Sequence, residues 1–115
     1  SLKVCKFSVT VGTRVEEYAR WLSLVTGWNV TPEELLETGE RIFTLKRLYN
    51  VALGMGRKED SLPERILKQP RGTGESADTL PDLERQLDEY YQFRGWTMKG
   101  LPTDETLEKL GLERL

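Results

Sequence analysis

Cys5 is the one side chain of this sequence that could act as a thiolate, either to bind iron or to serve as a nucleophile. The 115 residues contain one cysteine and no histidine, so the chain lacks the commonest near-neutral base and zinc ligand. A lone cysteine near apolar Val4 and Phe7 is most often a small buried hydrophobe. Cluster ligands also come from separate segments, so Cys5 could complete a set that begins elsewhere. A single thiol favours a reducing compartment, and we expect a cytoplasmic protein.

A second candidate is the charged run of residues 57–60, Arg-Lys-Glu-Asp, after a glycine-containing turn. It could contact an anionic cofactor, but its two signs cancel, which favours a solvated mixed-charge loop. Glu59 and Asp60 are adjacent carboxylates, yet no pattern makes them converge on a substrate. The aromatic residues predict core packing more strongly than a ligand platform; these are Trp28, Trp96, Tyr90 and Tyr91.

Two amphipathic helices are expected in the first half of the chain. Thr13 with Glu16 predicts a capping box, and the helix it starts should end at Gly27, with Trp28 packed back over the last turn. Thr31, Pro32 and Glu34 open a second helix by the same capping logic, and Gly54 and Gly56 end it. Apolar residues at helical spacing give each helix one core face.

The second half predicts a loop region and two more helices. Residues 57–78 are predicted to be irregular, with one helical turn at 62–65 and a Gly-rich loop at 71–77. A helix follows from about Leu80 to Tyr91, and Thr103 caps a last one that ends at Gly111. The only strand-like alternation is at residues 6–11.

The sequence therefore predicts an all-α domain of four to five helices, with a short extended N-terminal segment. We divide it into a segment at 1–12, a two-helix unit at 13–56, the loop region at 57–78 and C-terminal helices at 79–115. The 37% hydrophobic content is enough for a modest core.

Composition argues against two classes of partner. Seventeen basic and nineteen acidic residues give a net charge of −2, which favours neither nucleic acid nor an anionic lipid surface. No apolar run approaches about 18 residues, so we expect no membrane span, and the N-terminus has no signal-peptide pattern. The chain begins at Ser1 rather than Met, so an earlier segment is not excluded.

Several segments match, in residue type and order, those of a known family. They are Ser1-Leu2-Lys3-Val4-Cys5-Lys6-Phe7, the stretch 26–36 (TGWNVTPEELL), the pair 39–42 and 47–50, the charged run 57–65, Leu87-Asp88-Glu89-Tyr90-Tyr91 with Arg94-Gly95-Trp96, and Leu101-Pro102-Thr103. Together they cover almost the whole chain, and in this order they resemble the C-terminal domain of the tungsten-containing aldehyde ferredoxin oxidoreductase family.

The resemblance implies a part of an enzyme that oxidises aldehydes to carboxylic acids and passes electrons to ferredoxin. Family members hold tungsten, sometimes molybdenum, in a bis-pterin (molybdopterin) cofactor beside a four-iron four-sulfur cluster. Carried over to this sequence, Cys5 is the fourth cluster ligand and Val4 a pterin contact. The other three cluster cysteines and most of the pterin contacts lie upstream in the family, so the upstream domains are the expected partners, with ferredoxin and an aldehyde.

One residue departs from the family pattern. The motif has glycine two residues before the cysteine, where this chain has Lys3, and a Cβ with a cationic chain alters the backbone approach to the pterin. We expect the isolated fragment to be inactive and to bind no tungsten. The alternative is a free-standing helical protein-interaction module with no cofactor, in which Cys5 is only core; the length of the native chain discriminates between the two.

Overall fold

The computed structural model describes residues 2–75 and 77–114, and within them the fold is helical. The all-α prediction is confirmed. The longest helix is α3 (Pro32–Ala52), and a single isolated bridge, Trp96 with Pro102, is the one β-like pairing found in the described residues. The other elements are α1 (Phe7–Thr10), α2 (Val15–Thr26), the 3₁₀ turn η1 (Arg57–Glu59), α4 (Glu64–Lys68), α5 (Leu83–Phe93) and α6 (Asp104–Leu110).

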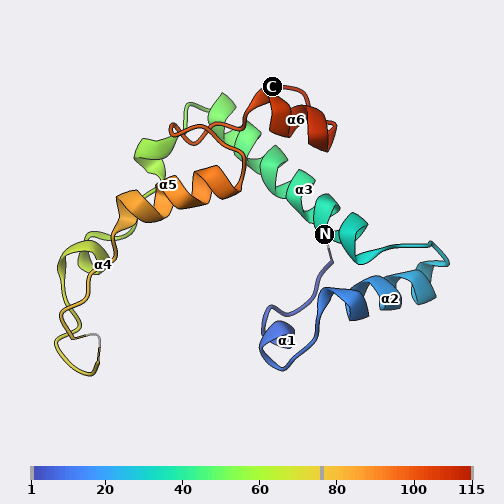
Figure 1. Cartoon of the computed structure of the whole chain (residues 1–115), viewed down its shortest axis with the longest axis horizontal. Coiled ribbons are helices and arrows are strands. Elements are labelled where there is room, and N and C mark those ends of the chain that lie inside the picture. The colour runs from blue at the N-terminus through green and yellow to red at the C-terminus, as the bar shows by residue number, and fades with distance from the viewer. Residues whose placement is uncertain (1, 76, 115) are drawn as a thin grey trace.

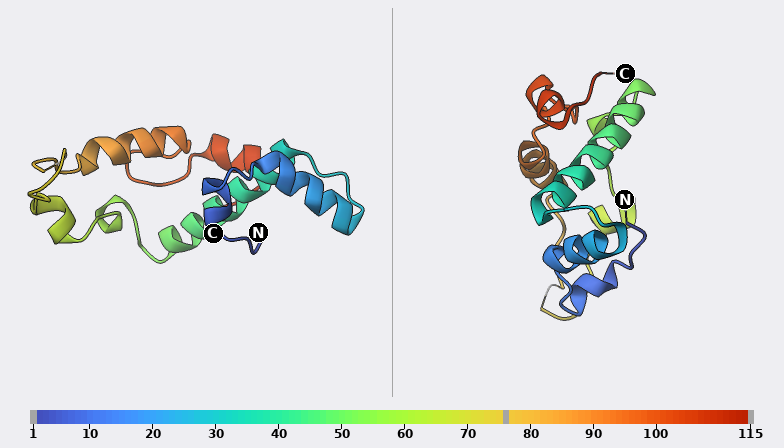
Figure 2. Two further views of the ribbon diagram at one scale, coloured as in Figure 1. Left: turned by 90° about the horizontal axis from the view of Figure 1, so that it is seen from below. Right: turned by 90° about the vertical axis from the view of Figure 1, so that its right-hand side faces the viewer.

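The chain is elongated around α3. Figure 1 shows α3 crossing the molecule, with α1 and α2 beside its N-terminal end, α5 and α6 flanking it on either side, and α4 at the far end. The side view in Figure 2 shows a thin, open arrangement. Its extents are 52 × 37 × 20 Å, and its radius of gyration is 17.9 Å, against about 13 Å for a compact chain of this length.

α2 begins one residue later than the sequence predicted. Its N-cap is Arg14, whose N–H donates to the Glu17 carboxylate at 2.5 Å, so the predicted Thr13–Glu16 box is wrong. The N–H of Thr13 instead donates to the Ser8 carbonyl at 3.0 Å, which commits Thr13 to the preceding turn. The end of the helix is as predicted, because Gly27 takes the left-handed conformation with φ +74°.

Trp28 does not pack back over α2, contrary to prediction. The connection after Gly27 is held instead by Ser23, whose hydroxyl accepts from the Val30 N–H at 3.0 Å. Trp28 is left exposed, with its N–H donating to the Thr26 hydroxyl at 3.2 Å.

The start of α3 confirms the strongest capping prediction. The Thr31 hydroxyl accepts from the Glu34 N–H at 3.1 Å, and the Glu34 carboxylate accepts from the Thr31 N–H at 2.9 Å. Pro32 occupies the first helical position, where its missing N–H costs nothing. This box fixes where the long central helix begins.

The strand considered for residues 6–11 is wrong, because Phe7–Thr10 form the single helical turn α1. Two hydroxyls bond locally: Ser8 Oγ donates to the Cys5 carbonyl and Thr10 Oγ1 to the Phe7 carbonyl, each at 2.6 Å. Such bonds favour a turn over an extended strand that has no partner. Residues 2–5 have no regular structure, and Ser1, the first residue of the family-like segment, lies outside the described residues.

The C-terminal half follows the predicted order. α5 and α6 are present, and Thr103 caps α6 by accepting from the Thr106 N–H at 3.2 Å. The expected helical turn near residues 62–65 is α4, and the described residues of the Gly-rich loop 71–77, which exclude Ser76, contain no helix. The core lies where α3 meets the C-terminal half of the chain, and its buried apolar side chains there are Leu48, Tyr91, Trp96, Leu107 and Leu110.

Within the described part of the chain, we find no helix that is both long enough and apolar enough to cross a bilayer.

Candidate functional site

Cys5 and Val4 lie in the irregular segment before α1, and both are exposed. The Cys5 carbonyl accepts two hydrogen bonds from Ser8, from its N–H at 3.0 Å and from its hydroxyl at 2.6 Å. Ser8 Oγ also hydrogen-bonds the Tyr18 hydroxyl, which ties this turn to α2. The backbone of Cys5 is thus anchored to α2 while its thiol faces outward.

This geometry fits a thiolate that serves as one ligand of a shared iron–sulfur cluster. The thiol is free and accessible, and a four-iron cluster takes four thiolates, of which this sequence supplies one. The described residues also contain no group of three or more His, Cys, Asp or Glu placed to hold a metal ion. A cluster of this kind bound through Cys5 would need three thiolates that this sequence does not supply.

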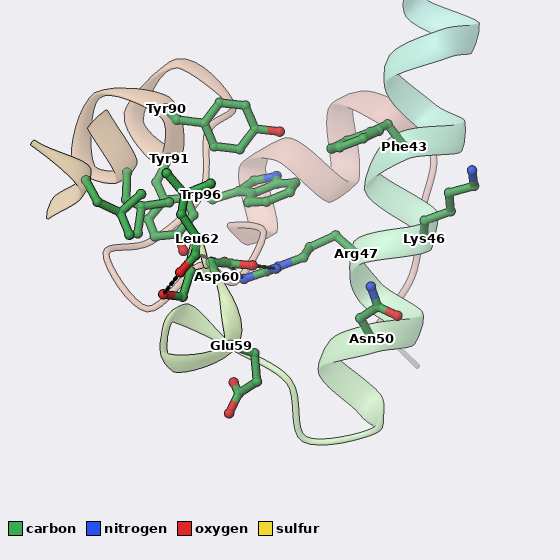
Figure 3. A pocket seen from close by; sticks show the side chains of 13 residues that line it. Phe43, Lys46, Arg47, Asn50, Glu59, Asp60, Leu62, Tyr90, Tyr91 and Trp96 are labelled. Atoms are coloured by element: carbon green, nitrogen blue, oxygen red, sulfur yellow. Dashed lines mark hydrogen bonds and ion pairs between the residues drawn. The ribbon is translucent and has the colours of Figure 1, made fainter. Parts of the chain in front are cut away.

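A second site is a cavity of about 490 Å³ between α3, the turn at 57–62 and α5. Figure 3 shows Arg47 reaching from α3 to Asp60, with Tyr91 beside them. The Arg47 guanidinium donates to the two Asp60 carboxylate oxygens at 2.8 and 2.6 Å and to the Gly100 carbonyl at 2.7 Å. The Tyr91 hydroxyl donates to the same carboxylate. We call these four residues the Arg47 network.

Burial and hydrogen bonding act together on the titration of the network. Burial alone would raise the pKa of Asp60, but the hydrogen bonds from Arg47 and Tyr91 outweigh it, so this pKa lies below its ordinary 3.8. Burial, with the hydrogen bond to Asp60, raises the pKa of Tyr91 to about 12. The carboxylate therefore stays charged and the phenol neutral at pH 7, so the network offers neither a free base nor a free acid.

The lowered pKa of Asp60 predicts a loss of stability in acid. The ionised carboxylate stabilises the fold fully above its unfolded pKa, and this contribution is lost as the pH falls through the lower folded pKa. We expect the difference in free energy of unfolding between the wild type and Asp60→Asn to shrink from about pH 6 to about pH 3. Urea unfolding at several pH values measures it; a difference that stays constant would contradict the prediction.

An aromatic cluster borders the cavity and holds a second arginine. The Arg94 guanidinium lies 4.3 Å from the centre of the Phe43 ring and 5.4 Å from that of Trp96, and it pairs with Glu40 at 2.8 Å. Nε and Nη2 of Arg94 are buried and have no hydrogen-bonding partner among the described residues, so the aromatic faces take the place of acceptors. The predicted core role of Trp96 is confirmed, since it is only 5% exposed.

The predicted solvated loop at residues 57–60 is wrong for two of its members. Arg57 donates to the Asp88 and Glu84 carboxylates of α5 at 2.6 Å each, and Asp60 belongs to the Arg47 network. The two adjacent carboxylates separate, because Glu59 turns back to accept from the Gly56 N–H at 2.7 Å. The charged run therefore fastens the turn after α3 onto α5.

Sequence reasoning missed Arg47, although a signal was present. Arg47 precedes Leu48 and follows Thr44 by three residues, on the buried face of α3. Charged side chains are seldom buried without a partner, so a cation on a core face predicts a buried carboxylate elsewhere in the chain. The pattern does not say which carboxylate.

Comparisons with known proteins agree on one family. The family described as aldehyde ferredoxin oxidoreductase, domains 2 and 3, matches residues 1–112. The tungsten-containing aldehyde ferredoxin oxidoreductase of Pyrococcus abyssi is 38% identical over 111 residues, which are 96% of this chain and 18% of that protein. An aliphatic sulfonate oxidoreductase, WOR-like subunit, of Pyrococcus furiosus is 31% identical over 121 residues, 97% of this chain and 19% of that protein.

A solved structure agrees with the sequence comparisons. The active site complex BamBC of benzoyl coenzyme A reductase, in complex with 1,5-dienoyl-CoA, superposes with a TM-score of 0.69 at 30% identity. The match covers 87% of this chain and 14% of that one. The chain thus spans less than a fifth of the length of the two Pyrococcus relatives. From the match over residues 1–112 and these similarities, the chain belongs to the aldehyde ferredoxin oxidoreductase family.

Proposed function

We propose that this chain is the C-terminal part of an aldehyde:ferredoxin oxidoreductase and supplies one ligand, the Cys5 thiolate, to its four-iron four-sulfur cluster. The observation that carries the proposal is the exposed thiol of the only cysteine, on a turn anchored to α2, in a chain of this family. A soft thiolate binds iron strongly, whereas carboxylates prefer harder metals.

The other residues of the N-terminal segment set the surroundings of that ligand. Ser8 holds the Cys5 carbonyl from two sides, which limits the positions open to the thiolate. Val4, exposed next to Cys5, would be the contact of this segment with a bis-pterin cofactor. This chain would wall one side of the cofactor cavity while the remaining ligands come from other parts of the polypeptide.

For the whole polypeptide we propose the conversion of an aldehyde and water to a carboxylic acid, two electrons and two protons. When bound, the tungsten (or molybdenum) bis-pterin supplies the two-electron chemistry, and ferredoxin is the proposed acceptor by way of the cluster. A free thiol and cluster chemistry fit the reducing cytoplasm. The 115 residues alone hold one cluster ligand and should be inactive.

Removal of the Cys5 thiolate tests this function. In the native polypeptide purified without oxygen, we expect about four irons per chain for the wild type and loss of most of that iron in Cys5→Ala, because the cluster loses one of its four ligands. Iron and tungsten or molybdenum are measured by elemental analysis, beside the cluster absorption. Val9→Ala, an exposed apolar truncation in the same segment, is the control and should retain its iron.

Two results would contradict the proposal. A wild-type native polypeptide without iron and without tungsten or molybdenum would overturn the function as a whole. Full iron in Cys5→Ala would overturn the ligand role of Cys5 while leaving the family membership intact.

A further inference from the structure

α2 carries two apolar faces, and only one of them is used within this chain. Tyr18, Ala19 and Leu22 face inward, and Ala19 is buried. Trp21, Leu24 and Val25, at i, i+3 and i+4, share a second side of the helix, and Trp28 follows just beyond its end at Gly27. Their exposed fractions are 50%, 73%, 85% and 68%. We call these four residues the outer α2 face.

An exposed apolar stripe of this kind is unusual for a protein that folds and remains a monomer. Contiguous apolar patches on soluble proteins mark interaction sites, and tryptophan is enriched among the residues that dominate binding. The chain also exposes 9216 Å² of surface, against about 6,500 Å² expected for a folded monomer of its mass. Figure 2 shows the open arrangement of the helices that goes with this large surface.

The outer α2 face is joined directly to the turn that carries Cys5. The ring of Trp21 meets Tyr18 edge to face with centroids 5.5 Å apart, and the Tyr18 hydroxyl bonds Ser8, which holds the Cys5 carbonyl. A protein segment that packs against Trp21 therefore lies close to the turn that carries Cys5.

We propose that the outer α2 face is the docking surface for the part of the same native polypeptide that carries the remaining cluster ligands. The curated relatives are more than five times as long as this chain, and this chain has only one cysteine to offer. The remaining cluster ligands must approach Cys5 closely. The outer α2 face is linked to the turn that carries Cys5, and a segment that covers this face would bury Trp21, Leu24, Val25 and Trp28. This inference rests on the proposed function.

Hydroxyl-radical footprinting of the tryptophans, read by mass spectrometry, tests the docking surface. In the 115-residue chain alone, Trp21 and Trp28 should oxidise readily, whereas buried Trp96 should be protected. In the native polypeptide we expect oxidation of Trp21 and Trp28 to fall about tenfold, as their exposed area is covered. Trp96 is the internal control, because it should be protected in both samples.

Equal oxidation of Trp21 and Trp28 in the two samples would overturn the docking proposal. Protection already present in the 115-residue chain, and rising with its concentration, would assign the face to a second copy and overturn it as well. The footprint is independent of the iron measurement. If Cys5→Ala loses its iron but both tryptophans stay unprotected, only the docking surface is contradicted. If the tryptophans are protected but Cys5→Ala keeps its iron, only the ligand role of Cys5 is contradicted.

Discussion

Asp60→Ala is expected to lower the free energy of unfolding of the chain by about 3 kcal/mol, since it leaves the Arg47 guanidinium buried without its carboxylate. The side chain of Arg47 is 9% exposed and that of Asp60 26%, so the cation cannot turn to water without opening the packing around Gly100 and Tyr91. The Tyr91 hydroxyl loses its acceptor in the same variant. Denaturant unfolding followed by circular dichroism measures the change.

Two further variants distinguish the cost of leaving the Arg47 charge buried without a partner from the general cost of a substitution in this region. Glu59→Ala removes the neighbouring exposed carboxylate, whose bond is to the Gly56 N–H, and should cost about 1 kcal/mol or less. Arg47→Met keeps the apolar stem and should make Asp60→Ala much less costly when the two are combined. Additive losses in the double variant would show that the pair does not act as a unit.

Gly100→Ala is the second substitution with a large expected effect, about 3 kcal/mol, of which about 1–2 kcal/mol is the left-handed backbone penalty. Gly100 has φ +75°, and a Cβ there would overlap the Arg47 guanidinium and lie 3.1 Å from the Tyr91 ring. The methyl group thus displaces the Arg47 guanidinium, which donates to the carbonyl of the same residue. Thermal and denaturant unfolding give the loss.

Gly54→Ala is the matched control for Gly100→Ala. Its φ of +86° carries a similar backbone penalty, but nothing lies within 4 Å of the added Cβ. We therefore expect about 1–2 kcal/mol at Gly54, the strain alone. Equal losses at the two glycines would mean that the contact of Gly100 with the Arg47 network contributes nothing.

The features predicted correctly from sequence are those whose cause lies within a few residues. The capping box at Thr31, the left-handed end at Gly27 and the cap at Thr103 each depend on one local hydrogen-bonding or steric requirement. The error at Thr13 was a choice between two adjacent carboxylates, Glu16 and Glu17, which the pattern does not distinguish.

The features that sequence did not predict depend on distant residues. Arg47 meets Asp60 across 13 positions and Gly100 across 53, and no periodicity reports such pairings. Trp28 was expected in the core because its local context is that of a helix end, but nothing within the described residues covers it. The ligand role of Cys5 came from the family resemblance, since the residues alone favoured an ordinary buried thiol.

The Arg47 network has a consequence for how the chain opens. It joins α3, the turn at 57–60, α5 and the loop at Gly100, so these parts can separate only together. α2 has no such bond to them among the described residues and contributes a single buried residue, Ala19. We therefore expect α1 and α2 to form a low-stability cooperative unit that unfolds below the global transition, with amide protons in α2 exchanging through this partial opening. In the chain alone, we expect the helix that anchors Cys5 to be the first to lose its structure.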